Sequence, residues 1–219
     1  MNREEVCARI EEIGIIPAVR VSSPEDAVFA AKAIHHSQIP IVEVTATVPR
    51  AIEVIAQLRR EVPDLVVGAG TLLDVDTAWH CLDSGAQFLT SPGLVLDIVA
   101  FAKKHEVVVF PGALTPTEVS TAWNAGADFV KVFPCAQVGS ENYIRALKAP
   151  FPDIRLIAAG GVTQHTAFDF ILAGASALGI GVALIPSESV RHRNEEQIRE
   201  LGRRFRKLVK EARSRRAQP

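Results

Sequence analysis

Short apolar runs rich in β-branched residues alternate with longer segments of helical periodicity along the chain. Such runs are typical of buried strands in a parallel sheet, because helices cover both faces of that kind of sheet. They lie near residues 15–20, 41–46, 65–70, 87–90, 107–111, 127–132, 154–158 and 176–181. The helical periodicity between them is clearest over residues 24–36, 51–61, 74–84, 94–105 and 117–125. The pattern therefore predicts repeated strand–helix units.

Eight such units at a regular pitch predict an α/β fold, a (β/α)8 TIM barrel, in one domain over residues 1–219. The alternative is a doubly wound open sheet, which would carry a G-x-G-x-x-G motif after its first strand. Residues 14–26 contain no such motif, so the barrel is favoured. An extra N-terminal helix over residues 2–13 precedes the first strand and could close the bottom of the barrel.

Composition and charge narrow the possible partners and the location. Of the 219 residues, 48% are hydrophobic and 22% charged, and the formal net charge is -1. This balance favours neither nucleic acid nor an anionic membrane as a partner. Cys7, Cys81 and Cys135 show no CxxC spacing, which indicates a reducing compartment and no zinc site. No signal peptide and no membrane span are predicted, so we expect a cytoplasmic protein.

The C-terminal segment, about residues 187–219, is basic and helical in pattern, most clearly from Arg203 to Arg216. One interpretation is a patch that binds anions or nucleic acid. The other is a solvated last helix that frays, and the balanced charge of the rest of the chain favours it.

Lys131 lies within an apolar run between Gly126 and Pro134 that reads as a short buried strand. An ammonium group there either reaches water with its tip or is desolvated, and a desolvated ammonium group loses proton affinity. A neutral lysine can attack a carbonyl carbon and form a Schiff base. Lys131 is therefore the candidate nucleophile.

Glu43 lies in a second strand, in the phase opposite to its apolar neighbours Val42 and Val44, so it is expected to point into the barrel. A lone strand carboxylate could simply form a structural ion pair. An inward carboxylate near an amine is also a proton-transfer pair. The pattern favours the second interpretation by a small margin.

Glycine-rich turns follow several strands, where the active sites of barrels lie. Backbone amides in residues 68–71, with the Thr71 hydroxyl, could hold a carboxylate or phosphate. Residues 160–161 and 179–182 follow the last two strands, where barrels often bind phosphate. The strand ends carry no cluster of histidines and no hydrolase triad, so neither a metal nor another cofactor is expected.

Five motifs in chain order resemble the signatures of bacterial 2-keto-3-deoxy-6-phosphogluconate / 4-hydroxy-2-oxoglutarate aldolases, over about Ile15 to Pro186. The motifs are residues 41–45, 67–71, 91–92, 110–118 and 130–134. The resemblance implies a class I, metal-independent, pyruvate-dependent aldolase on a (β/α)8 barrel, usually a homotrimer. It makes Lys131 the Schiff-base lysine and Glu43 the proton shuttle. It also implies a substrate-binding set: Gly70 and Thr71 at the carboxylate, Pro92 and Phe133 as pocket walls, and Gly160, Gly161, Gly181 and Val182 near the phosphate.

The chain departs from the family pattern around the substrate anions. Thr47 stands where the family commonly has an arginine that grips the keto-acid carboxylate. Ala158-Ala159 replaces a Pro-Thr pair, and Val182 replaces a serine beside the broken glycine pair at Gly181. A threonine hydroxyl supplies no bidentate ion pair. The Lys131–Glu43 pair is intact, so the replacements predict aldolase chemistry on a short or weakly anionic substrate.

Three functions remain open from the sequence. The first is cleavage of a 2-keto-3-deoxy or 4-hydroxy-2-keto acid, possibly phosphorylated, to pyruvate and an aldehyde, without a cofactor. The second is a differently specific phosphate-binding barrel, such as a sugar-phosphate epimerase. The third is a non-catalytic barrel that binds a metabolite. The paired acids or metal set that an epimerase usually needs are not found in the sequence.

Overall fold

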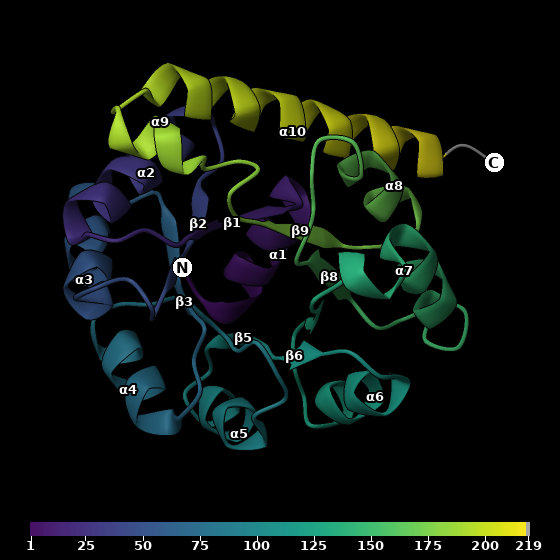
Figure 1. Cartoon of the computed structure of the whole chain (residues 1–219). Coiled ribbons are helices and arrows are strands. Elements are labelled where there is room, and N and C mark those ends of the chain that lie inside the picture. The colour runs from purple at the N-terminus through teal and green to yellow at the C-terminus, as the bar shows by residue number, and fades with distance from the viewer. Residues whose placement is uncertain (218–219) are drawn as a thin grey trace.

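Parallel strands form the inner wall of the molecule and helices surround them (Figure 1). The structure is a computed structural model that describes residues 1–217. Its strands are β1 (Ile15–Val19), β2 (Ile41–Thr45), β3 (Val66–Gly70), β4 (Phe88–Thr90), β5 (Val108–Phe110), β6 (Gly112–Ala113), β7 (Val130–Val132), β8 (Leu156–Ala159) and β9 (Ala177–Ile180). The order in the sheet is β5-β4-β3-β2-β1-β9-β8-β7-β6. The predicted (β/α)8 barrel is confirmed.

The two end strands of this order, β5 and β6, are consecutive in the chain and separated only by Pro111. Proline has no backbone N–H and so interrupts the ladder. Its carbonyl still accepts a hydrogen bond of 2.9 Å from the Lys131 amide. Residues 108–113 thus act as one barrel strand that pairs with β4 on one side and β7 on the other. The apolar run predicted near residues 107–111 covers β5, and the barrel strand continues for two residues beyond it, through β6.

The helices lie outside the strands, except α1, which lies across one end of the barrel (Figure 1). Caps predicted by the sequence are formed: the Ser23 side chain accepts from the Asp26 amide, and Thr115 and Glu118 form a capping box. Among the described residues no helix is long and apolar enough to cross a membrane. The helices are α1 (Arg3–Ile13), α2 (Pro24–His36), α3 (Ala51–Glu61), α4 (Val75–Asp83), α5 (Leu96–Lys104), α6 (Pro116–Asn124), α7 (Ser140–Lys148), α8 (Ala167–Leu172), α9 (Ser187–Arg191) and α10 (Glu195–Arg216), with a short 3₁₀ turn at Ala136–Val138.

The lower end of the barrel is filled by apolar side chains. Inward-facing residues at or next to the beginnings of the strands, two of them from β5, join Val6, Cys7 and Ile10 of α1 in one buried cluster. Its strand members are Ile16, Ile41, Val66, Phe88, Val108, Phe110, Phe129, Ile157 and Ala177. Arg3 fastens α1 to the wall through an ion pair of 2.9 Å with the buried Asp128. The N-terminal helix therefore closes the bottom, as predicted.

The last helix is packed against the barrel helices, which corrects the expectation of a solvated, fraying tail. Ile198, Phe205 and Val209 are buried at a spacing that places them on one face of α10. Arg213 donates to the carbonyls of Glu12 (2.7 Å) and Ser176 (3.0 Å). The helix continues to Arg216, and only residues 218–219 of the predicted tail lie outside the described residues.

Candidate active site

An amine and a carboxylate meet inside the upper half of the barrel. Lys131 comes from β7 and Glu43 from β2, and Nζ lies 3.6 Å from Oε2. Their side chains are 12% and 3% exposed. Both groups are largely removed from water, which strengthens the electrostatic interaction between them. The pair is positioned by the strand alternation that sends Ile41, Glu43 and Thr45 to one side of β2.

Glycines make the room that this pair occupies. A Cβ atom at Gly70 would lie 1.9 Å from Oε1 of Glu43, so any larger residue would displace the carboxylate. At Gly112, which is in register with Lys131, a Cβ would lie 2.1 Å from the carbonyl oxygen of Pro92. The loop that carries Pro92 therefore lies against β6, next to Lys131. Only a glycine at position 112 allows the two backbones to come so close.

Phe133 forms an aromatic wall next to the amine. The centroid of its ring lies 5.8 Å from Nζ of Lys131. Gly160 and Gly161 have φ values of +84° and +85°, and a Cβ at Gly160 would lie 3.0 Å from the Phe133 ring. The double glycine after β8 thus supports the aromatic wall while it leaves backbone groups at the rim, where an anion could contact them.

A guanidinium group lies beside the hydroxyl predicted to hold a carboxylate. Thr71 follows β3 with φ +61°, an unusual value for a residue with a branched side chain. Nη2 of Arg20, which follows β1, donates to Oγ1 of Thr71 over 3.4 Å. The sequence shows Arg20 at a strand end but gives it no role, because its partner is 51 residues away.

The remaining predicted residues lie around the rim. The Thr47 hydroxyl is 2.8 Å from that of Thr45, which in turn donates to the Val19 carbonyl. Gly181 faces open space, since a Cβ there would meet no atom within 4 Å. Val182 is 72% exposed, so the position expected near a phosphate presents an apolar side chain to solvent. The catalytic and binding roles of all these residues remain predictions.

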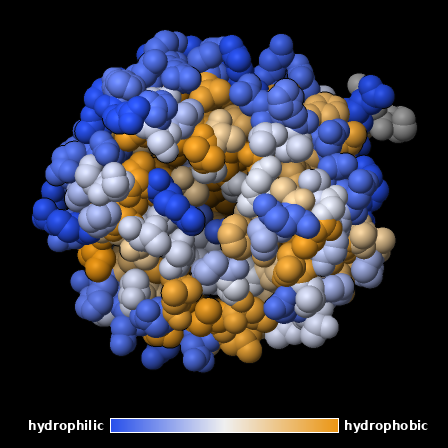
Figure 2. All heavy atoms as spheres, viewed as in Figure 1, coloured by the Kyte–Doolittle hydropathy of each residue, from blue (hydrophilic) through white to orange (hydrophobic). Residues whose placement is uncertain are grey.

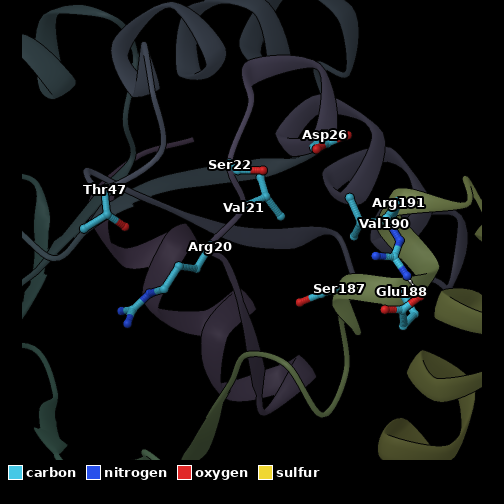
Figure 3. A pocket seen from close by; sticks show the side chains of 9 residues that line it. All are labelled: Arg20, Val21, Ser22, Asp26, Thr47, Ser187, Glu188, Val190 and Arg191. Atoms are coloured by element: carbon cyan, nitrogen blue, oxygen red, sulfur yellow. Dashed lines mark hydrogen bonds and ion pairs between the residues drawn. The ribbon is translucent and has the colours of Figure 1, made fainter.

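A cavity of about 680 Å³ opens beside the rim, between the loop after β1 and helix α9 (Figure 3). It shares Arg20 and Thr47 with the rim, while Lys131 and Glu43 are not among its lining residues. Its other lining residues are Val21, Ser22, Asp26, Ser187, Glu188, Val190 and Arg191. No local pattern in the sequence indicates this cavity, because α9 and the β1–α2 loop are far apart in the chain and meet only when the barrel closes.

Cysteines and metal ligands add little to this site. Burial, with a contribution from Glu141, raises the pKa of the Cys135 thiol to about 12, so at neutral pH it is protonated and a poor nucleophile. Over residues 1–217 no group of three or more histidine, cysteine or acidic side chains is arranged to hold a metal ion.

The space-filling view shows the mouth of the barrel as a hollow in this face of the molecule (Figure 2). A small molecule that enters this hollow would meet a guanidinium at the rim and the buried amine–carboxylate pair deeper inside. The amine–carboxylate pair resembles the family motifs in both residue type and position.

Comparison with known proteins shows which family the chain resembles over most of its length. The family model for KDPG and KHG aldolase matches residues 6–201. A 2-dehydro-3-deoxy-phosphogluconate aldolase of Treponema pallidum is 31% identical and covers 91% of this chain and 95% of its own. A Legionella pneumophila KDPG aldolase, with pyruvate captured at low pH as a covalent carbinolamine, superposes with a TM-score of 0.83 at 27% identity over 90% of this chain and 96% of that one.

A further structural match is a cube-shaped cage designed by fusing symmetric oligomeric domains. It superposes with a TM-score of 0.85 at 28% identity, over 93% of this chain and 74% of the cage chain. The family match spans most of the chain and includes both Lys131 and Glu43. This chain belongs to the KDPG and KHG aldolase family.

Proposed function

We propose that this protein is a class I aldolase that cleaves a 2-keto-3-deoxy or 4-hydroxy-2-keto acid to pyruvate and an aldehyde. The observation that carries the proposal is the buried pair of Lys131 and Glu43, whose reactive atoms lie 3.6 Å apart. An amine and a carboxylate at that distance can act on the same substrate carbon chain. The family match and the carbinolamine captured in the Legionella relative support the same chemistry.

The reaction begins when Nζ of Lys131 attacks the C2 carbonyl of the keto acid. Loss of water from the resulting carbinolamine gives an iminium ion, which acts as the electron sink. Glu43, directly or through a water molecule, removes the proton of the C4 hydroxyl, and the electrons of the C3–C4 bond move into the iminium as the aldehyde leaves. Protonation of the enamine at C3 and hydrolysis then release pyruvate and restore the amine.

The keto-acid carboxylate needs a cation that Thr47 does not supply. Arg20 and Thr71 provide a guanidinium and a hydroxyl within 3.4 Å of each other at the rim. An arginine binds a carboxylate through paired hydrogen bonds, which fixes its orientation as well as its position. We therefore assign the carboxylate to these two side chains, so that a guanidinium from the end of β1 does the work of the arginine that the β2 loop lacks.

The alternatives drawn from the sequence have less support. A sugar-phosphate epimerase or a non-catalytic metabolite-binding barrel would share the fold, but the family match is to aldolases. The aldolase reading also explains why a lysine and a glutamate are buried together, which a non-catalytic barrel would not require.

Borohydride reduction in the presence of pyruvate tests the proposal. The iminium should be reduced to a stable adduct, and peptide mapping should place that adduct on Lys131. The Lys131→Met variant should give no adduct, while Lys104→Met, a matched change at an exposed lysine on α5, should be labelled like the wild type. Cleavage should also continue in the presence of EDTA, since the iminium takes the place of a Lewis acid. An adduct on another lysine, or none, would contradict the class I mechanism.

We also propose a homotrimer, as the family resemblance implies. Leu73, Trp79 and Leu96 are 66%, 46% and 47% exposed on neighbouring elements around α4 and α5. Figure 2 shows hydrophobic atoms over α5, and apolar surface of this kind is typical of subunit contacts. Light scattering should give the mass of three chains, and Trp79→Lys should shift it toward one. A wild-type mass of one chain would refute the trimer.

We infer a cytoplasmic location from the thiols. Cys7, Cys81 and Cys135 are buried and unpaired, as expected where thiols stay reduced. Cell fractionation tests this location. Recovery of the enzyme outside the cytoplasmic fraction would contradict it.

A further inference from the structure

The two side chains that we assign to the substrate carboxylate come from strands that are not neighbours in the sheet. Arg20 follows β1 and Thr71 follows β3, and β2 lies between these strands. Because adjacent strands are about 4.8 Å apart, β1 and β3 are separated by roughly 10 Å. The Arg20 side chain therefore crosses the end of β2 to bring its Nη2 within 3.4 Å of Oγ1 of Thr71. Figure 3 shows it extending from β1 toward the side on which Thr47 lies.

The end of β2 is hydrogen-bonded to both of these neighbours, at the residue just before each of the two side chains. Toward β1, Oγ1 of Thr45 donates to the carbonyl of Val19 over 3.1 Å. Toward β3, the amide of Ala46 donates to the carbonyl of Gly70 over 2.7 Å. Two consecutive residues thus restrain the backbone from which the guanidinium and the hydroxyl project.

The bond toward β1 is made by a side chain, so a substitution can remove it without changing the backbone. The paired residues of β1 and β2 end at Val19 and Val44. The Thr45 hydroxyl adds a bond one residue beyond that pair, and Thr45 is 0% exposed, so water does not compete for this bond. Residues 20–23 belong to no strand or helix. The hydroxyl therefore restrains the chain where it leaves the sheet.

Thr47 orients this hydroxyl. The side-chain oxygens of Thr45 and Thr47 are 2.8 Å apart. A hydroxyl has one hydrogen, and that of Thr45 is directed to the Val19 carbonyl, so Thr45 accepts in its contact with Thr47. The turn that brings the two together is closed by a hydrogen bond of 3.0 Å from the Val48 amide to the Thr45 carbonyl. The Thr47 hydrogen is thus engaged within the protein.

We infer that Thr45 is a positioning residue, whose hydroxyl fixes the end of β1 so that the Arg20 guanidinium lies across β2 beside Thr71. Thr47 orients that hydroxyl, and so contributes to recognition of the keto acid without contacting it. The inference rests on the proposed function and adds to it the group that places the carboxylate-binding arginine. Because Thr45 acts through Arg20, its loss should weaken binding of the carboxylate more than it slows the chemical steps.

The experiment follows exchange of the C3 protons of pyruvate by NMR, as a function of pyruvate concentration, in the full-length protein. Pyruvate carries only the carboxylate concerned, so the result does not depend on the aldehyde. Thr45→Val keeps the shape of the side chain and should raise the half-saturating concentration about three- to tenfold, with the maximal rate within about twofold of the wild type. Thr45→Ser keeps the hydroxyl and should stay near the wild-type concentration.

Thr90 provides a matched control. It is also 0% exposed at a strand end, and its Oγ1 donates to the carbonyl of Phe110 on the neighbouring strand over 2.7 Å. It belongs to β4, which lies two strands beyond β2 in the sheet. Thr90→Val should therefore lower stability about as much as Thr45→Val without raising the half-saturating concentration. An equal rise in both variants would mean that Thr45 serves only the fold.

A double-mutant cycle tests whether Thr45 acts through Arg20. In the Arg20→Met background, Thr45→Val should cause no further rise, because the group that it places is gone. Thr47→Val, a change at an exposed residue that leaves the core intact, should raise the half-saturating concentration about two- to fivefold, again only when Arg20 is present. It keeps the test decisive even if Thr45→Val fails to fold.

Unchanged half-saturation in Thr45→Val and Thr47→Val, or equal effects with and without Arg20, would overturn the positioning role. Borohydride trapping of pyruvate on Lys131 separates this inference from the proposed function. If the wild type is trapped while the variants show no change in half-saturation, only the positioning role fails. If the wild type is not trapped, the proposed function fails as well.

Discussion

The lower and upper halves of the barrel interior use inward-facing positions of the same strands but fill them in opposite ways. In the lower half Phe88, Phe110 and Phe129 pack with ring centroids 5.1 and 6.3 Å apart. In the upper half the last inward position of β3 is Gly70, and the next inward position of the β5–β6 strand after Phe110 is Gly112. Side-chain volume therefore changes from very large to none within two residues of one strand.

This contrast shows how one set of strands supplies both stability and a reactive site. The aromatic floor excludes water from below and fixes the curvature of the wall through dense packing. The glycines above it have no side chains, and this leaves room for the Glu43 carboxylate and the Lys131 amine. Loss of a floor residue should therefore cost stability, whereas loss of a residue above the floor should cost activity.

The largest expected effect is in the upper half. Glu43→Gln should slow both cleavage and proton exchange at C3 of pyruvate by about 10²–10⁴-fold, the range of general acid–base catalysis. The amide cannot accept the proton, but Lys131 remains, so borohydride trapping should persist. The exchange rate followed by NMR is the measurement. Exchange at the wild-type rate would mean that the carboxylate is structural.

The matching change in the floor should act on stability. Phe129→Ala should lower the free energy of unfolding by about 3–5 kcal/mol, because it leaves a cavity in a densely packed cluster. Denaturant unfolding measures the loss. Phe168→Ala, at a partly buried phenylalanine of α8, should cost less. If Phe129→Ala abolished trapping of pyruvate while the protein stayed folded, the separation between floor and site would be wrong.

At the rim the effect should be smaller and should appear in binding. Arg20→Met should raise KM for the keto acid by roughly tenfold to a hundredfold, since hydrogen bonds to charged groups are worth about 1.5–3 kcal/mol. The double variant Arg20→Met/Thr47→Arg should recover part of the loss, because the second change returns a guanidinium to the rim. Steady-state kinetics decide the matter, and an unchanged KM in Arg20→Met would remove Arg20 from the carboxylate site.

The smallest effect should be a pH dependence in the floor. Burial, aided by the nearby Asp128, raises the pKa of the Cys7 thiol to about 12. Between the unfolded value of 9.0 and about 12, the unfolded chain releases this proton while the folded chain keeps it. The folded state then binds more protons, so stability falls as pH rises through that window. Unfolding measured from pH 9 to 11 should show a steeper decline for the wild type than for Cys7→Ala, and equal slopes would contradict the buried thiol.

The sequence predicted the parts of the site that lie on strands. Period-two alternation along β2 was enough to turn Glu43 inward, and a lysine within an apolar strand was enough to mark Lys131. Their meeting follows from the barrel, since inward residues of different strands share one interior. The barrel strand continues past Pro111, because proline lacks the N–H donor but keeps its carbonyl acceptor.

What the sequence could not predict depends on contacts between distant loops. Arg20 contacts Thr71, 51 residues away, and the cavity acquires its wall from α9, which Arg193 fixes to α2. No local pattern records such pairings. The spacing of Ile198, Phe205 and Val209 does indicate that one face of α10 is packed. The many basic residues of this helix made that spacing easy to miss.

The hydrogen bonds of Arg213 have a consequence for how the protein is made. This residue near the end of the chain holds carbonyls of Glu12 and Ser176, and so joins the last helix to the first and to the approach to β9. In the sheet, β9 also lies between β1 and β8. During synthesis the first strands emerge long before these partners exist, so the growing chain carries an open sheet with unpaired edges. The barrel can close only after β9 has been made, and α10 then secures the joint between its first and last strands.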